Sequence, residues 1–149
     1  MPNDENVGYL IEHPKLYDNK TGLYNLKLFA QVLGDGFDKE YANHIIESFG
    51  MQDYIYKKVK KYSLGMKQKL GIAIAFLNHP QLIVLDEPMN GLDPKAVRDV
   101  RELIVETAKQ GTTFLISSHI LSELVKITDS ILIIDEGKII KQTTREELN

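Results

Sequence analysis

Residues 82–88 read Leu-Ile-Val-Leu-Asp-Glu-Pro, four apolar residues followed by two acids and a proline. An unbroken apolar run of this kind is typical of a strand that is buried on both faces of a parallel sheet. The acids Asp86 and Glu87 then lie at the carboxyl end of the strand, where open α/β sheets bind their ligands. Asp86 is suited to hold Mg²⁺, and Glu87 is suited to act as a general base. The competing interpretation is that Asp-Glu-Pro only ends the strand in a turn.

The sequence after residue 88 predicts alternating helices and strands. Asp93-Pro94 is typical of a helix start, with Asp as the cap and Pro in the first turn, and Gly111 predicts the end of this helix. Apolar runs at residues 113–116 and 131–134 predict two more buried strands, with a helix over residues 119–128 between them. Residues 138–141 predict a hairpin partner for the last strand. This alternation indicates crossover connections and a mostly parallel sheet, so the predicted fold class is α/β.

The first half of the chain is predicted to be mainly helical. A short β-type run at residues 7–11 comes first, and Thr21, Asp38 and Ser63 are each placed to cap a helix. The glycines at residues 34 and 50 predict the ends of the first two helices. We therefore expect three parts, which are a strand and loop, a helical subdomain and the second half of an α/β core, at residues 1–20, 21–78 and 79–149.

Composition narrows the class of protein. The chain has 149 residues, of which 43% are hydrophobic, enough for one domain with a core. A net charge of -3 argues against a general nucleic-acid binder, and the absence of cysteine excludes disulfides and thiolate metal sites. Asp4 and Glu5 interrupt the start of the chain, where a signal peptide needs an apolar stretch. The apolar runs are too short to span a bilayer, so we expect that any association with a membrane is mediated by a partner protein.

Two further segments carry candidate ligand-binding residues. Ser63 and Gly65 open a predicted helix, where a hydroxyl, free N–H groups and the helix dipole form an anion site, and a glycine lets the backbone approach a phosphate. A routine serine cap would give the same pattern. His119 follows the predicted strand at residues 113–116, so it should emerge at the same sheet edge as Asp86 and could donate to a phosphate oxygen. The alternative is a helix residue that contacts no ligand.

Taken in this order, the elements resemble the ATP-binding subunits of ABC transporters over nearly the whole chain. The matching segments are the Q-loop strand, the signature motif, the Walker B strand, the D-loop and the switch histidine, at residues 7–12, 63–68, 82–88, 90–93 and 119. The resemblance implies ATP and Mg²⁺ as ligands. It implies catalytic roles for Glu87 and His119, and a Mg²⁺ contact from Asp86, with Glu12 as a second candidate for Mg²⁺. The residues expected to bind the nucleotide are Ser63, Gly65, Glu12 and Asp93.

Two departures from the usual motifs point to one branch of the family. The usual signature is Leu-Ser-Gly-Gly-Gln, and Tyr62, Leu64 and Met66 stand here in place of the Leu, the first Gly and the Gln. Glu12 stands in the Q-loop where Gln is usual. Both changes look like the bacterial exporters of bacitracin and lantibiotic-type peptides. A carboxylate only accepts hydrogen bonds when ionised, so the contact made by Glu12 would differ in detail from that of Gln.

The resemblance also implies a fold, partners and a location. The expected fold is the C-terminal part of a P-loop NTPase core with the ABC helical subdomain. The expected partners are a membrane-spanning permease and a second ATP-binding subunit, with a homodimer favoured and no nucleic acid, in the cytoplasm on the inner face of the cell membrane. The sequence has no Gly-x-x-x-x-Gly-Lys-Ser/Thr loop for the phosphates. We therefore expect a fragment that is inactive alone and that self-associates through an exposed sheet edge.

Two other functions remain open at this point. A soluble ABC ATPase of the translation or DNA-repair type would carry the same motifs, although residues 21–78 are too short for the long coiled coils of the repair type. A non-catalytic interaction module would need none of the nucleotide chemistry. Coding sequence for a glycine-rich loop upstream of Met1 would identify a fragment of an ATPase and not an interaction module. A neighbouring gene for a multi-span membrane protein would favour the transporter.

Overall fold

The computed structural model describes residues 7–10, 15–33, 37–117, 130–135 and 138–144. The chain forms two compact units, Met1–Ser117 and Ser118–Asn149. None of the helices in the described ranges combines the length and the apolar content that crossing a membrane requires.

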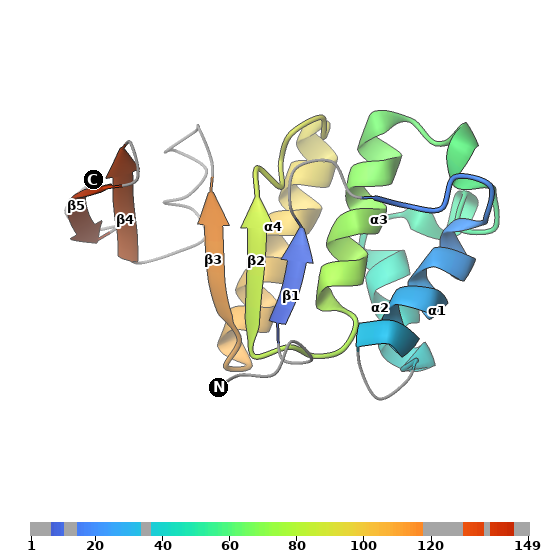
Figure 1. Ribbon diagram of the computed structural model, residues 1–149, viewed down its shortest axis with the longest axis horizontal. Coiled ribbons are helices and arrows are strands. Elements are labelled where there is room, and N and C mark those ends of the chain that lie inside the picture. Colours follow the sequence, from blue (N-terminus) through green and yellow to red (C-terminus); the bar gives the residue numbers. More distant parts are fainter. Residues whose placement is uncertain (1–6, 11–14, 34–36, 118–129, 136–137, 145–149) are drawn as a thin grey trace. The chain divides into compact units, whose positions relative to one another are not determined.

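The first unit contains a three-stranded parallel sheet and its helices (Figure 1). The strands lie in the order β1-β2-β3, and Asp86 at the end of β2 is paired with Ser117 at the end of β3. The parallel pairing confirms the α/β prediction. The elements are β1 Val7–Leu10, α1 Gly22–Leu33, α2 Lys39–Ser48, the 3-10 helices η2 Met51–Asp53 and η3 Val59–Lys61, α3 Leu64–Phe76, β2 Leu82–Asp86, α4 Pro94–Lys109 and β3 Thr113–Ser117.

The helices begin where the sequence predicts, because each start has a side chain that binds a free N–H group of the first turn. Asp38 accepts from the Tyr41 N–H at 3.1 Å, and Thr21 accepts from the Tyr24 N–H at 3.0 Å. The ends predicted at Gly50 and Gly111 agree as well, since these residues have φ angles of 64° and 104° that an L side chain rarely adopts. The end predicted at Gly34 lies outside the described residues.

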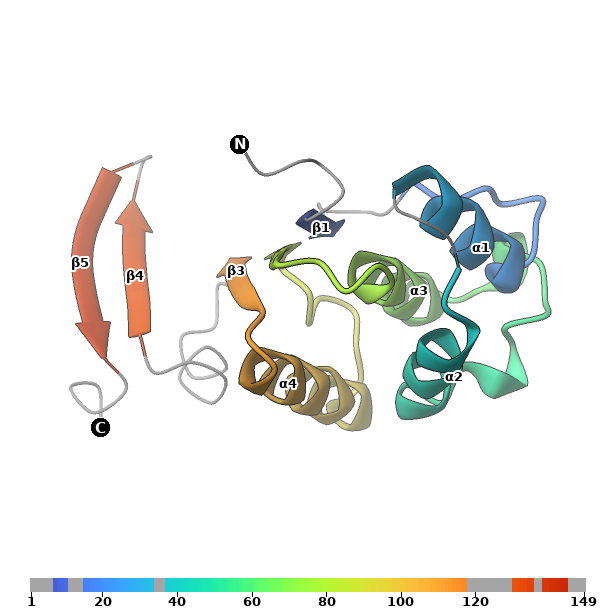
Figure 2. The ribbon, with the colours of Figure 1, turned by 90° about the horizontal axis from the view of Figure 1, so that it is seen from below.

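One face of the sheet carries the core of the unit. Helices α3 and α4 lie on the same side of the sheet (Figure 2), and they bury Ile83 and Leu85 of β2 to 0% and 1% exposure. The prediction that β2 and β3 are buried on both faces is wrong for this unit. Leu82 and Val84 are half-buried and Leu115 of β3 is 58% exposed. The reason is that the described helices of this unit cover one face, so the strands alternate in burial despite their unbroken apolar runs.

Helix α3 joins the helical part to the sheet. It packs on β1 and β2 on one side and on α1 and α2 on the other. Because it is surrounded, it is apolar on nearly all sides, as a buried helix must be. Its seven buried residues are Gln68, Leu70, Gly71, Ile72, Ala73, Ala75 and Phe76. Displacement of α3 would therefore disturb both the helical part and the sheet.

The second unit is described only where it forms a β-hairpin. β4 Ser130–Asp135 pairs antiparallel with β5 Lys138–Thr144, with a register shift between Ile133 and Ile134. The hairpin partner predicted at residues 138–141 is confirmed. β4 pairs with β5 in a two-stranded sheet, and the predicted place of residues 131–134 in the parallel sheet stays a prediction. The predicted helix at residues 119–128 lies outside the described residues.

The basic and aromatic stretch at residues 54–62 forms the end of the helical part. Its lysines are exposed, as a solvated face predicts. Tyr56 is exposed as well, but Tyr54 and Tyr62 are buried: the Tyr62 hydroxyl donates to the Tyr54 carbonyl oxygen at 2.7 Å, and the two rings meet edge to face at 5.0 Å. In the part of the chain that the structure describes, the buried Tyr54 hydroxyl has no hydrogen-bond partner. Burial raises the pKa of Tyr62 to about 12 and raises the pKa of Tyr54 further.

We expect the two tyrosines to respond differently to loss of the hydroxyl. Tyr62→Phe should lower the free energy of unfolding by about 1 kcal/mol, because it removes a buried hydrogen bond to the Tyr54 carbonyl oxygen, which keeps only its bond from the Lys57 N–H, whereas Tyr54→Phe should be neutral or slightly stabilising. Urea denaturation at pH 7 measures both. Because their pKa values are raised on folding, both hydroxyls favour the native state below about pH 10, and this contribution is lost as the pH rises through 12. Equal losses for the two variants would contradict the assignment.

Candidate functional site

The two candidate acids lie where β2 ends beside β3. The Ser117 hydroxyl donates to the Asp86 Oδ1 atom, and the Glu87 N–H donates to the Ser117 carbonyl oxygen at 3.0 Å. The ends of both strands are thereby tied together, and both acids are half-buried. Ser117 is a site residue that the sequence did not reveal, because its contact with Asp86 depends on the register of two strands about thirty residues apart.

Glu87 has an unusual backbone conformation. Its φ angle is 49°, in the left-handed region, which costs a residue with a side chain about 1–3 kcal/mol. A turn holds it: the Asn90 N–H donates to the Glu87 carbonyl oxygen at 3.1 Å. A second turn follows, closed by the Leu92 N–H and the Met89 carbonyl oxygen at 3.2 Å, in which Gly91 has a φ angle of 79°. Strain of this kind concentrates at functional sites, where the surrounding structure maintains it.

The start of α3 has the form of an anion site. Ser63 accepts the Met66 N–H at 3.1 Å, and the Met66 sulfur accepts the Ser63 N–H at 3.4 Å. The pair is a capping box in which sulfur takes the place of the usual Glu or Gln side chain. Met66, which departs from the usual signature, therefore completes the cap at the start of this helix. The N–H groups of Leu64 and Gly65 have no acceptor within the helix, so they are available to an anion.

The start of α3 also packs directly on the loop that follows β2. A Cβ atom on Gly65 would lie 3.0 Å from the Gly91 carbonyl oxygen, and one on Gly91 would lie 3.3 Å from Leu64 Cδ2. Gly65 is thus required by this close contact between backbones, in addition to the predicted approach of a phosphate. Because α3 begins and β2 ends at the same end of the unit (Figure 1), this loop joins the candidate anion site to the two candidate acids.

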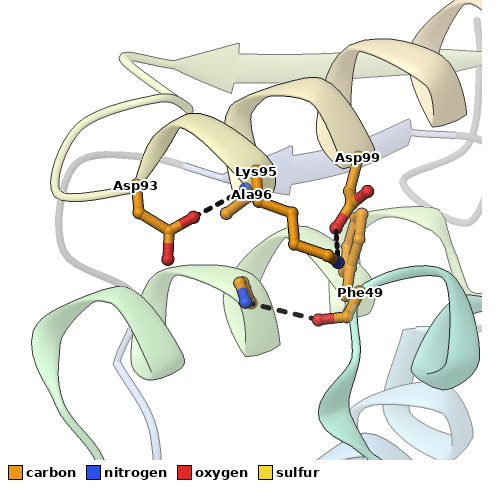
Figure 3. A network of polar contacts seen from close by, with 6 residues as sticks. Phe49, Asp93, Lys95, Ala96 and Asp99 are labelled. Atoms are coloured by element: carbon orange, nitrogen blue, oxygen red, sulfur yellow. Dashed lines mark hydrogen bonds and ion pairs between the residues drawn. The ribbon is translucent and has the colours of Figure 1, made fainter.

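Asp93 starts α4 at the end of the same loop. Its Oδ1 atom accepts the Ala96 N–H at 2.8 Å, and Lys95 pairs with Asp99 at 3.1 Å one turn further on (Figure 3). The predicted cap is confirmed. Its predicted contact with a nucleotide stays a prediction, because a cap explains the same residue.

Two of the candidate residues, Glu12 and His119, lie outside the described residues, and their roles stay predictions. Within the described ranges, no three acids, histidines or cysteines converge as metal ligands. Mg²⁺ needs fewer, because it is held by one or two carboxylates together with phosphates and waters. The half-buried Asp86 carboxylate and the Ser117 hydroxyl beside it offer the oxygen atoms that this ion prefers. The residues present therefore fit Mg²⁺.

A model of the ABC transporter family matches residues 2–90 of the chain. The chain belongs to this family. Among its relatives, the bacitracin transport ATP-binding protein BcrA of Bacillus licheniformis is 43% identical over 143 residues, which cover 95% of this chain and 46% of the relative. The lantibiotic transport ATP-binding protein SrtF of Streptococcus pyogenes is 43% identical over 134 residues, covering 90% of this chain and 58% of the relative. These relatives confirm the branch of the family that the signature and Q-loop departures indicate.

A solved structure described as an ATP-binding subunit of an ABC transporter shares the fold. It superimposes with a TM-score of 0.85 at 30% identity, over 97% of this chain and 61% of the other. The predicted fold class, part of a P-loop NTPase core with helices on a mostly parallel sheet, is thereby confirmed. The chain spans about half the length of the curated relatives that it matches.

Proposed function

We propose that this chain belongs to the nucleotide-binding subunit of an ABC transporter that hydrolyses ATP to drive export through a membrane permease. The observation that carries the proposal is the pair of acids at the end of β2, with Glu87 held in a left-handed conformation beside Asp86. Family membership and two relatives named for transport of bacitracin and of a lantibiotic support it, and they favour a peptide antibiotic as the exported substrate.

Each candidate residue has a role in this proposal. Asp86 holds Mg²⁺, directly or through water, and Glu87 takes up the proton of the water that attacks the terminal phosphate. ATP supplies the phosphoanhydride bond that is broken. The hydroxyl of Ser63 and the N–H groups at Gly65 bind the phosphates of ATP held by the second subunit. The further contacts proposed are those of Asp93 with the nucleotide, of Glu12 with the nucleotide and Mg²⁺, and of His119 with the terminal phosphate.

The partners follow from the same proposal. The permease contacts the surface around residues 12–28, and the second ATP-binding subunit is a copy of the first. The complex lies in the cytoplasm against the inner face of the membrane. We also propose the division into a Q-loop part at residues 1–20, a helical subdomain at residues 21–78 and the second half of the ATPase core from residue 79 onward.

Mg²⁺-dependent ATP hydrolysis by the complete subunit tests this proposal. We expect turnover on the order of 1 s⁻¹ or faster when the subunit is assembled with its permease, and loss of turnover when EDTA removes the metal. The 149 residues alone should bind ATP only weakly in calorimetry, because their sequence has no glycine-rich phosphate loop. A micromolar ATP affinity of this chain alone, or the absence of turnover by the assembled subunit, would contradict the proposal.

A further inference from the structure

Gln68 is a buried polar residue in the second turn of α3. It is 8% exposed, and its Nε2 atom donates to the carbonyl oxygens of Glu87 and Pro88 at 3.2 Å and 3.0 Å. An amide nitrogen carries two hydrogens, so both donors are committed to one short segment of backbone. The two acceptors also settle the orientation of the amide, because its oxygen cannot bind a carbonyl. A buried amide bound in this way resists movement of the segment that it binds.

The segment that Gln68 binds carries the candidate base. Glu87 has a φ angle of 49°, and such a conformation persists only where the surroundings maintain it. On the sheet side, the Glu87 N–H is bound to the Ser117 carbonyl oxygen at 3.0 Å. On the helix side, Gln68 binds the carbonyl of the same residue and the next one. The turn is therefore held from β3 and from α3 together.

The same helix contacts the loop at a second point. The first turn of α3 packs so closely on Gly91 that a Cβ atom at Gly65 would lie 3.0 Å from the Gly91 carbonyl oxygen. Helix α3 thus contacts the loop after β2 at two points. Hydrogen bonds hold residues 87 and 88, and the helix backbone packs on residue 91. The cap of this helix, Ser63, is the candidate anion ligand. Because α3 is a packed helix of 13 residues, a shift at its capped end moves the Gln68 amide as well.

We propose that Gln68 is a positioning residue, which holds the Glu87–Pro88 turn so that the Glu87 carboxylate stays at the end of β2. Through Gln68, the anion end of α3 is linked to the general base. The proposal rests on the proposed function, since it assigns Glu87 as the base. The simpler alternative is that Gln68 only satisfies two carbonyl groups and contributes stability, and the tests below separate the two.

The first test measures the turn itself and needs no ATP. In Gln68→Met, a side chain of similar length without donors, amide hydrogen exchange at Glu87 and Asn90 should be about tenfold faster or more. Gln68→Glu keeps the shape of the side chain but removes its hydrogen-bond donors, so it should also speed up exchange at Glu87 and Asn90. Ile72→Val, which trims a buried side chain on the same helix, is the matched control and should leave these two amides within about twofold. Amides of Val100 and Leu103 in α4 serve as the internal reference.

The second test measures catalysis by the complete subunit. Gln68→Met should lower kcat about tenfold while the KM for ATP stays within about twofold, because the base is displaced but the nucleotide contacts remain. When Glu87 is already replaced by Gln, Gln68→Met should cause no further loss, because the two residues act as one unit. Single-turnover measurements with excess enzyme resolve the low residual rates.

The outcomes separate failure of this inference from failure of the proposed function. Unchanged exchange at Glu87 and Asn90 would overturn the inference whatever the protein does. A second outcome would also overturn the inference: exchange becomes faster, but the loss of kcat in Gln68→Met adds in full to the loss in Glu87→Gln. Gln68 would then have a structural role alone. Normal turnover of the Glu87→Gln subunit would remove the base from the proposed function and the positioning role with it, while the exchange result would still report whether Gln68 holds the turn.

Discussion

Replacing Glu87 by Gln should lower ATP turnover by the complete subunit by about 10²–10⁴-fold, the usual contribution of a general base. The amide keeps the size of the side chain and loses the capacity to take up a proton. The Glu87 N–H and carbonyl oxygen both take part in hydrogen bonds that hold the left-handed turn, and an amide of the same size leaves these backbone bonds in place, so the turn should keep its conformation. ATP affinity should therefore remain within about threefold of the unsubstituted subunit.

Steady-state hydrolysis and equilibrium nucleotide binding, measured on the same preparations, check this result. Glu102→Gln is the matched control, because Glu102 is an exposed acid on α4 and the same charge is removed. Its turnover should equal that of the unsubstituted subunit. Normal turnover by Glu87→Gln would show that another group accepts the proton, and an equal loss in both variants would trace the effect to net charge.

Phe76→Ala should lower the free energy of unfolding by about 3–5 kcal/mol. Phe76 is the last residue of α3, is fully buried and lies against Phe114 of β3 with ring centres 5.7 Å apart. A pocket of about 250 Å³ that opens to solvent already borders it, so truncation would extend this pocket into the core. Because α3 carries Ser63 and Gln68 on its other turns, loosening this end should also weaken the link between helix and sheet.

Urea denaturation of Phe76→Ala beside Leu115→Ala checks this expectation. Leu115 lies on the neighbouring position of β3 and is 58% exposed, so its truncation should change stability by no more than about 0.5 kcal/mol. A loss for Leu115→Ala as large as that for Phe76→Ala would mean that the open face of the sheet is covered in solution. That outcome would contradict the one-sided burial of this sheet.

Local chemistry explains what could be predicted from the sequence. Asp38, Ser63 and Asp93 cap helices because each side chain binds an N–H group three residues ahead, so the cap and its partner lie together in the sequence. The strand at residues 82–86 and its acids follow from an apolar run and the position of its end. The family resemblance rests on the same local motifs, and comparison with known proteins confirms it.

The remaining features depend on residues that are distant in the chain. The unbroken apolar runs of β2 and β3 predict burial on both faces, but burial depends on which faces the helices cover. Gln68 contacts residues 19 and 20 positions ahead, and Ser117 reaches back 31 positions to Asp86. No local pattern encodes such contacts, because they form when packed elements bring the residues together. The left-handed conformation of Glu87 belongs with them, since a non-glycine residue keeps that conformation only where tertiary contacts outweigh its cost.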